Sequence, residues 1–157
     1  MADKISPERR SANMRAIRHK DTSPEMLVRR VLTQMRYRYR LHVKSLPGKP
    51  DLVFLQRRKI VLVHGCFWHQ HSCPEGRKPL SNSDYWEPKL TGNVKRDVRH
   101  AKELKALGFD VMVIWDCETK NEGDVARRLR KFLGPKHREW DARLKRKKAP
   151  RTNATGD

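Results

Sequence analysis

Cysteine, acidic residues and long apolar stretches are all scarce in this sequence of 157 residues. Its three cysteines are an odd number, which argues against the disulfide framework of a small secreted protein and favours a reducing cytoplasm. No apolar run approaches the ~20 residues that a membrane-spanning helix requires, and no signal peptide is recognised at the start of the chain. The sequence therefore predicts a cytoplasmic protein without a membrane partner.

The shortage of acidic residues leaves the chain strongly basic. Its 37 Lys and Arg residues against 18 Asp and Glu give a formal net charge of +19. A polyanion such as nucleic acid is the expected partner of such a chain. A basic surface that only keeps the protein soluble is the alternative, but basic residues alternate with aromatic ones at specific places. We therefore favour a nucleic-acid-binding function.

The hydrophobic pattern predicts one α/β (or α+β) domain over residues 1–135 and a basic, loosely ordered tail over residues 136–157. Ser23 is expected to cap the second helix, with Pro24 at its first position. Helices are expected over about 6–19, 23–35, 83–107 and 124–133, and strands over 37–43, 52–55, 60–63 and 109–115.

The order of these elements predicts a mixed sheet flanked by helices. The second and third strands should form a hairpin, and the fourth strand is apolar enough to be central. A break is expected in the third helix near residues 91–92, and Gly108 is expected to end this helix. The inward face of the same helix should carry Val94, Val98, Ala101, Leu104 and Leu107.

Cysteine and histidine are concentrated in one phrase, His64-Gly-Cys-Phe-Trp-His-Gln-His-Ser-Cys73, directly after the third predicted strand. A structural zinc site is formed by four thiol or imidazole ligands that leave no open coordination position. The two cysteines of this phrase and Cys117, after the fourth strand, supply three ligands. Residues two apart on an extended loop point the same way, so the spacing leaves open whether His69 or His71 is the fourth. Buried free cysteines or a catalytic zinc are alternatives, but three thiols favour a structural role.

Asp51 is the one acidic residue between Glu25 and Glu75, and it opens the second predicted strand after a proline. A carboxylate at the head of such a strand recurs in metal-dependent nucleases, where it holds Mg²⁺ against the scissile phosphate. Pro-Asp alone is a weak signal, because an Asp after a turn more often makes local hydrogen bonds. Its place beside the histidine-rich loop favours the catalytic interpretation.

Several separate motifs follow one another along the chain. They are Asn13-Met-Arg-Ala-Ile17, Asp21-Thr22, Ser45-Leu-Pro-Gly-Lys-Pro-Asp51, His64-Gly-Cys-Phe-Trp-His69 with His71 and Cys73, and Asn93-Val94 with Arg96-Asp97. Together they resemble the very short patch repair (Vsr) endonucleases, over about residues 10–117. The resemblance implies a type II restriction-endonuclease-like fold. It also implies Mg²⁺-dependent, strand-specific nicking of duplex DNA beside a T:G mismatch, which arises when 5-methylcytosine deaminates to thymine.

The resemblance also implies roles for individual residues. Asp51 would be the principal Mg²⁺ ligand and His69 the general base or acid at the phosphate. Glu25 and His64 would support this site, and Asp97 would be a partner for a histidine. The structural Zn²⁺ would be held by Cys66, His71, Cys73 and Cys117. DNA contacts would come from the wedging rings of Phe67, Trp68 and Trp86 and from Met14, Ile17, Lys89 and Asn93.

One departure concerns the third predicted strand. Where many nucleases of the wider superfamily carry an acidic residue, any residue and a lysine, this chain has Val63-His64-Gly65. Val63 can serve Mg²⁺ only through its backbone carbonyl. The missing lysine shifts proton transfer to a histidine, whose ordinary pKa lies near neutrality.

The resemblance names double-stranded DNA with a T:G mismatch as the partner, mismatch-repair proteins as further candidates, and a bacterial, nucleoid-associated location. Residues 1–20 would contact DNA, and a monomer is expected because one nick needs one active site. The alternative is a zinc-stabilised DNA-binding module without catalysis. Asp51 with His69 argues against it, because a protein that only binds gains nothing from a carboxylate near phosphates. A zinc hydrolase acting on small substrates is disfavoured by the charge of +19.

Overall fold

The computed structural model describes residues 6–9, 12 and 21–135. Most of the predicted first helix lies outside these residues, as do Met14, Ile17 and the predicted tail. The described helices are α2 (Ser23–Gln34), η1 (Pro74–Gly76), α3 (Ser83–Ala106), η2 (Asp116–Lys120) and α4 (Glu122–Leu133). The described strands are β1 (Arg40–Leu41), β2 (Leu52–Phe54), β3 (Lys59–His64) and β4 (Asp110–Trp115).

The four strands form one mixed sheet in the order β1-β2-β3-β4. The first three strands pair antiparallel, whereas β3 and β4 run parallel and are connected through α3. The predicted mixed sheet and the predicted hairpin of β2 and β3 are confirmed. The predicted central place of the fourth strand is wrong, because β4 lies at an edge of the described sheet. The apolar side chains of β4 point to the two faces of the sheet, where helices cover them. Its apolar character therefore does not require a further strand beside it.

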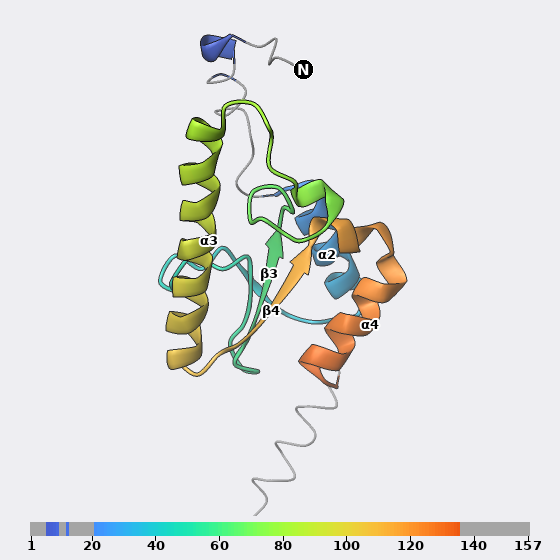
Figure 1. Cartoon of the computed structure of the whole chain (residues 1–157). Coiled ribbons are helices and arrows are strands. Elements are labelled where there is room, and N and C mark those ends of the chain that lie inside the picture. The colour runs from blue at the N-terminus through green and yellow to red at the C-terminus, as the bar shows by residue number, and fades with distance from the viewer. Residues whose placement is uncertain (1–5, 10–11, 13–20, 136–157) are drawn as a thin grey trace, which may run out of the picture.

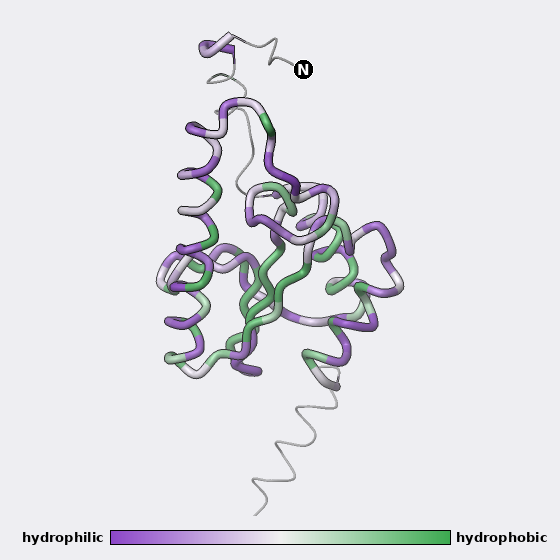
Figure 2. The backbone as a smooth tube through the Cα atoms, in the orientation of Figure 1, coloured by the Kyte–Doolittle hydropathy of each residue, from purple (hydrophilic) through white to green (hydrophobic). Residues whose placement is uncertain are grey.

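Apolar side chains fill both faces of the sheet, with α3 on one face and α2 and α4 on the other (Figure 1). Neighbouring residues of a strand point to opposite faces, so strands buried on both sides are apolar at every position. Figure 2 shows this hydrophobic character along β3 and β4. The core under α2 and α4 contains Val28, Leu32, Leu52, Phe54, Val61, Ile114, Val125 and Leu129. The core under α3 contains Val53, Ile60, Leu104 and Phe109.

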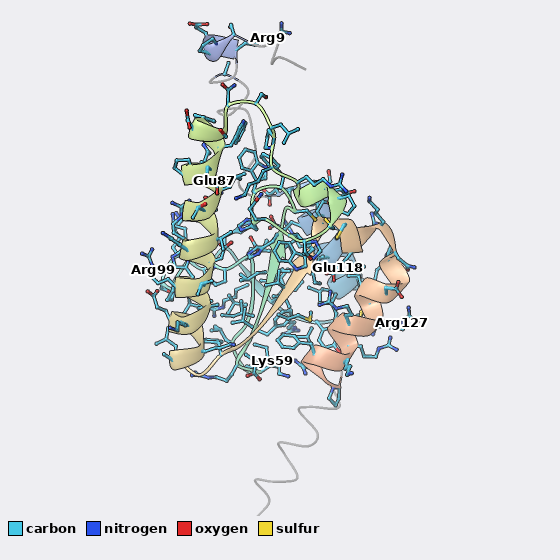
Figure 3. All side chains as sticks on the ribbon, in the orientation of Figure 1. Arg9, Lys59, Glu87, Arg99, Glu118 and Arg127 are labelled. Carbon is cyan, nitrogen blue, oxygen red and sulfur yellow. The ribbon has the colours of Figure 1, made fainter. Side chains whose placement is uncertain are left out.

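The outer sides of the helices are mostly polar (Figure 2). Arg99 on α3 and Arg127 on α4 point away from the sheet on opposite sides of the molecule (Figure 3). None of the described helices is both long and apolar enough to cross a membrane.

The N-cap of helix α2 lies one residue earlier than the sequence predicts. Thr22, rather than Ser23, is its N-cap, and the Thr22 hydroxyl accepts a hydrogen bond from the backbone N–H of Glu25 over 3.5 Å. Val28 and Leu32 are fully buried, which confirms the predicted apolar face of this helix.

The first strand is much shorter than the predicted range of 37–43. Only Arg40 and Leu41 pair with β2. Arg36 and His42 adopt left-handed backbone conformations, with φ of 61° and 44°, and such residues interrupt an extended strand. Tyr37 is nevertheless buried and meets the ring of Phe54 edge-on, with 6.5 Å between the ring centroids.

Helix α3 runs without the break predicted near residues 91–92. A glycine inside a helix costs only about 0.5–1 kcal/mol relative to alanine, which is too little to interrupt a helix that packs on a sheet. Leu104 is buried as predicted, but Val98 and Leu107 are 58% and 49% exposed, so their predicted inward position is wrong. Gly108 ends the helix in a left-handed conformation, with φ of 88°, as expected.

Candidate active site and metal cluster

The predicted catalytic and zinc-binding residues meet at the C-terminal ends of β3 and β4. This side of the sheet, which runs across the strand ends, is called the edge below. These strands are parallel, so the segment after β3 and helix η2 after β4 lie over the same edge (Figure 1). Strand β2 is antiparallel to β3, which brings Asp51, directly before β2, to this edge as well. The sheet topology therefore gathers side chains that are far apart in the sequence.

Asp51 is held by the backbone of β3. Its Oδ2 accepts a hydrogen bond from the N–H of Val63 over 2.9 Å. Burial raises the pKa of the Asp51 carboxyl to about 6, against the lowering effect of the Val63 hydrogen bond. The charge of Glu25 adds to this increase in pKa, while His42 and His69 reduce it. A carboxylate in such a place is poorly solvated, and a divalent cation would stabilise its charged form.

The raised pKa makes Asp51 costly for stability when no divalent cation is added. Its ordinary pKa of 3.8 is below the folded-state value of about 6, so the folded protein binds more protons between these pH values. The free energy of unfolding therefore falls as pH rises through this window. Above it the full penalty, at most about 3 kcal/mol, is present.

We therefore expect Asp51→Asn to stabilise the cation-free protein. Chemical denaturation at pH 7.5 should give the variant a larger free energy of unfolding than the parent, and the difference should be about half as large at pH 5. Equal stabilities at pH 7.5 would contradict the assigned environment of this carboxyl.

His69 and Asp97 form an oriented pair beside Asp51. Nδ1 of His69 lies 2.5 Å from Oδ2 of Asp97 on α3. When Nδ1 carries the hydrogen of this bond, Nε2 is left as a proton acceptor. The ring of His64 stacks on that of His69, with 3.9 Å between the centroids and 8° between the planes.

The surroundings of His64 determine the charge of its ring. Burial lowers the pKa of His64 to about 4, with a further decrease from the charge of His69 and an opposing effect of Asp97. His64 is therefore a neutral ring at neutral pH. Its neighbour His69 is the histidine whose Asp97 partner can stabilise a charged imidazolium.

Glu25, in the first turn of α2, is only 2% exposed, and both of its carboxylate oxygens have partners. Oε1 lies 2.6 Å from Nε2 of His42, and Oε2 accepts a hydrogen bond from the backbone N–H of Asp21 over 2.8 Å. The sequence predicts a supporting role for Glu25 but does not identify His42. The period-two pattern assigns His42 to a strand, and no motif indicates that its ring turns toward α2.

The three cysteines and His71 form a second cluster. One donor atom from each of Cys66, His71, Cys73 and Cys117 lies within 4.8 Å of the others. The backbone N–H of Cys117 donates to Sγ of Cys66 over 3.3 Å, and Sγ of Cys117 lies 3.4 Å from Nδ1 of His71. Three sulfur atoms and one imidazole nitrogen fit the four-coordinate arrangement of a structural metal site.

The backbone separates the two candidate histidine ligands. Gln70 is left-handed, with φ of 53°, and turns the chain between them. His69 consequently meets Asp97, whereas His71 meets the cysteines and stacks on Trp115 at a centroid distance of 4.3 Å. The expectation that both rings point the same way is wrong, because the loop is not extended at this place.

Close backbone packing holds the loop around this cluster. A Cβ atom at Gly76 would lie 2.0 Å from the carbonyl oxygen of His71, so only glycine fits there. The side-chain amide of Gln70 donates to the carbonyl of Phe67 over 2.6 Å and to that of Gly76 over 3.3 Å. Sequence reasoning identified neither Gly76 nor Gln70 as part of the site.

Three predicted DNA-wedging rings gather beside the loop. Phe67 and Trp68 come from the loop and Trp86 from α3, and their centroids lie 5.0 to 6.1 Å apart. Each ring is partly buried. Tyr85, which the sequence did not single out, is 43% exposed and lies 5.0 Å from Trp86. These four side chains are called the aromatic cluster below.

Two further predicted DNA-contacting residues of α3 lie against this cluster. The side-chain amide of Asn93 donates to the backbone carbonyl of Trp68 over 3.0 Å. Nζ of Lys89 lies 5.8 Å from the ring centroid of Tyr85. Asn93 thus links α3 to the loop, and the ammonium group of Lys89 adds positive charge beside the rings.

Known proteins resemble this chain over most of its length. The family model described as DNA mismatch endonuclease Vsr matches residues 2–75. A type II nicking enzyme of Xanthomonas oryzae, V.XorIIP, is 49% identical over 135 residues, which are 86% of this chain and 99% of the relative. V.NmeAIP of Neisseria meningitidis is 42% identical over 85% of this chain and 95% of its own length. The DNA mismatch endonuclease Vsr of Escherichia coli is 39% identical over 74% of this chain and 75% of its own length.

Proposed function

Because the chain belongs to the Vsr family of DNA mismatch endonucleases and is a DNA-nicking endonuclease, we propose that it cuts one strand of duplex DNA beside a T:G mismatch, with Mg²⁺ as the cofactor. The observation that carries the proposal is the meeting of Asp51, Glu25 and the His69–Asp97 pair at one edge of the sheet. A module that only binds DNA would gain nothing from these carboxylates. The mixed sheet with Asp51 at the head of its hairpin supports a restriction-endonuclease-like fold.

We assign the Mg²⁺ site to the carboxylate of Asp51 and the backbone carbonyl of Val63. A bound Mg²⁺ would polarise a phosphoryl oxygen and increase the acidity of the attacking water. The residues fit such an ion, because burial disfavours the negative charge of the Asp51 carboxylate and a bound cation would stabilise that charge. Glu25 contributes a second negative charge within electrostatic reach of Asp51.

Proton transfer is assigned to His69. Its Nε2 would accept a proton from the attacking water or return one to the leaving oxygen. Asp97 holds the ring through Nδ1 and stabilises the imidazolium form. His64 stacks on one face of the His69 ring and limits its movement.

We assign a structural Zn²⁺ to Cys66, His71, Cys73 and Cys117. Burial raises the pKa of the Cys66 thiol to about 12, so this thiol stays protonated in the metal-free protein and would lose its proton on binding. The site would join the loop that carries Phe67, Trp68 and His69 to helix η2. Its proposed role is therefore to hold the aromatic and catalytic side chains in place. A single chain contains all of these groups, which supports action as a monomer.

A pool of duplexes with one T:G mismatch and randomised flanking base pairs tests the proposed substrate. The full chain should nick a subset of this pool when Mg²⁺ is present and none when it is withheld. A matching pool with T:A in place of T:G should stay intact. Equal cutting of both pools would contradict mismatch recognition and leave only a general nicking activity.

Trp68→Ala is expected to weaken binding to a T:G duplex more than binding to the matched duplex. Unstacking a mismatched base step costs less than unstacking a paired one, and stacking on a ring returns about 1–3 kcal/mol per base. The selective loss should therefore be about fivefold to a hundredfold. Fluorescence anisotropy without Mg²⁺ measures both affinities.

Leu80→Ala is the matched control, because Leu80 is an exposed apolar residue of the same connecting segment outside the aromatic cluster. The salt dependence of binding should be unchanged in both variants, since phosphate contacts are untouched. Equal losses on matched and mismatched duplexes would show that Trp68 packs the loop rather than reads the lesion.

A further inference from the structure

His42 joins two parts of the candidate active site that come from different elements. Its ring Nε2 lies 2.6 Å from Oε1 of Glu25 on α2, and its backbone N–H donates to the carbonyl of Asp51 over 3.1 Å. One residue therefore holds the side chain of Glu25 and the backbone at Asp51 together.

The Glu25 carboxylate depends on His42 for its place. A glutamate side chain has several rotamers, and a helix alone does not select one of them. Here the Glu25 side chain is 3% exposed, so it cannot exchange a lost partner for bulk water. Without His42, Oε1 would have no hydrogen-bond partner among the described residues, and only the Asp21 N–H on Oε2 would remain. Turning toward solvent would then be the favoured response of such a carboxylate.

The two residues that contact the Glu25 carboxylate share a left-handed backbone conformation. Asp21 and His42 are non-glycine residues with φ of 54° and 44°. The backbone N–H of Asp21 donates to the Glu25 carboxylate, and the ring of His42 lies within hydrogen-bond distance of it. Left-handed residues of this kind are uncommon and persist where surrounding contacts hold them. A hydrogen bond of 2.7 Å from Arg29 to Asp21 is such a contact.

We propose that His42 is a positioning residue of the active site, which holds the Glu25 carboxylate so that its negative charge stays beside Asp51. The inference rests on the proposed role of Asp51 in binding a divalent cation. With Glu25 held in place, the edge of the sheet presents two carboxylates to the cation. When Glu25 is free to turn away, one carboxylate remains and cation binding weakens.

Two substitutions separate the hydrogen bond of His42 from its bulk. His42→Phe keeps a ring of similar size but removes the nitrogen that meets Glu25, and His42→Gln keeps a donor but removes the ring. His100→Ala is the control, because His100 is a half-buried histidine that packs against Gly48 and lies on α3, on the opposite face of the sheet from the helix α2 that carries Glu25.

The first readout is Mn²⁺ affinity, measured from the loss of the free-ion electron paramagnetic resonance signal. We expect His42→Phe to weaken Mn²⁺ binding about fivefold or more, and His42→Gln and His100→Ala to stay within about twofold of the parent. In a Glu25→Gln background, His42→Phe should cause no further loss, because His42 acts through Glu25.

The second readout is single-turnover nicking of a T:G duplex at subsaturating Mg²⁺, where His42→Phe should be about tenfold slower than the parent. Dependence of Mn²⁺ affinity on His42 without any nicking by the parent would support the positioning role and reject the proposed function. Parental Mn²⁺ affinity in His42→Phe, or losses that add to those of Glu25→Gln, would overturn the inference. If His42→Phe does not fold, His42→Leu, which also lacks a nitrogen to meet Glu25, takes its place: weaker Mn²⁺ binding than in His42→Gln supports the role, and parental affinity overturns it.

Discussion

Asp51→Asn is expected to abolish nicking while DNA binding survives. The substitution removes the carboxylate assigned to Mg²⁺, and a loss of about 4 kcal/mol or more in transition-state stabilisation corresponds to at least a thousandfold slower reaction. Binding should persist or strengthen, because one negative charge leaves the path of the phosphates. Single-turnover nicking and fluorescence anisotropy on the same T:G duplex measure the two effects separately.

The same variant is expected to be more stable than the parent at neutral pH, so unfolding would not explain its inactivity. Asp110→Asn is the matched control, because Asp110 is an exposed carboxylate at the start of β4, at the other end of the strand from the site. This control should nick at the parental rate. Nicking by Asp51→Asn at the parental rate would place the cation site elsewhere.

Cys117→Ala is expected to cause the largest loss of stability. The substitution removes one of four ligands, and structural zinc contributes about 10–16 kcal/mol of apparent binding free energy in small peptides. Losing even a quarter of this would lower the melting temperature by about 10 °C or more in a domain of this size. Elemental analysis and differential scanning calorimetry measure the zinc content and the melting temperature.

His69→Ala is the control for zinc loss, because His69 contacts Asp97 and not the cysteines. It should keep a full complement of zinc while nicking is severely slowed. Purified parental protein without zinc, or Cys117→Ala with a full complement, would contradict the assignment of the cysteine cluster.

Periodicity and turn chemistry predict the parts of this fold that depend on local sequence. The buried face of α2 follows from the helical spacing of Val28 and Leu32, and the hairpin of β2 and β3 follows from two apolar runs around a polar turn. Cys66 and Cys73 lie near Cys117 because the loop after β3 and the end of β4 are at the same edge of the sheet.

The remaining differences come from backbone conformations that the residue type does not reveal. Gln70 and His42 are left-handed although neither is glycine, and each turns a side chain toward a partner that the pattern does not predict. Gly92, by contrast, suggests a break where the packing of α3 on the sheet keeps the helix intact. The link between His42 and Glu25 depends on tertiary structure, because the residue after β1 and the first turn of α2 are brought together only in the folded domain.

Strand-resolved nicking tests the central claim most directly. A duplex from the pool above that contains one T:G mismatch, labelled differently on its two strands, is incubated with excess full chain and Mg²⁺ and separated on a denaturing gel. We expect one cut beside the mismatch, in the same single strand of every molecule, and no cut when Mg²⁺ is withheld or T:G is replaced by T:A. Cuts in both strands, equal cutting of the T:A duplex, or cutting without a divalent cation would contradict the account.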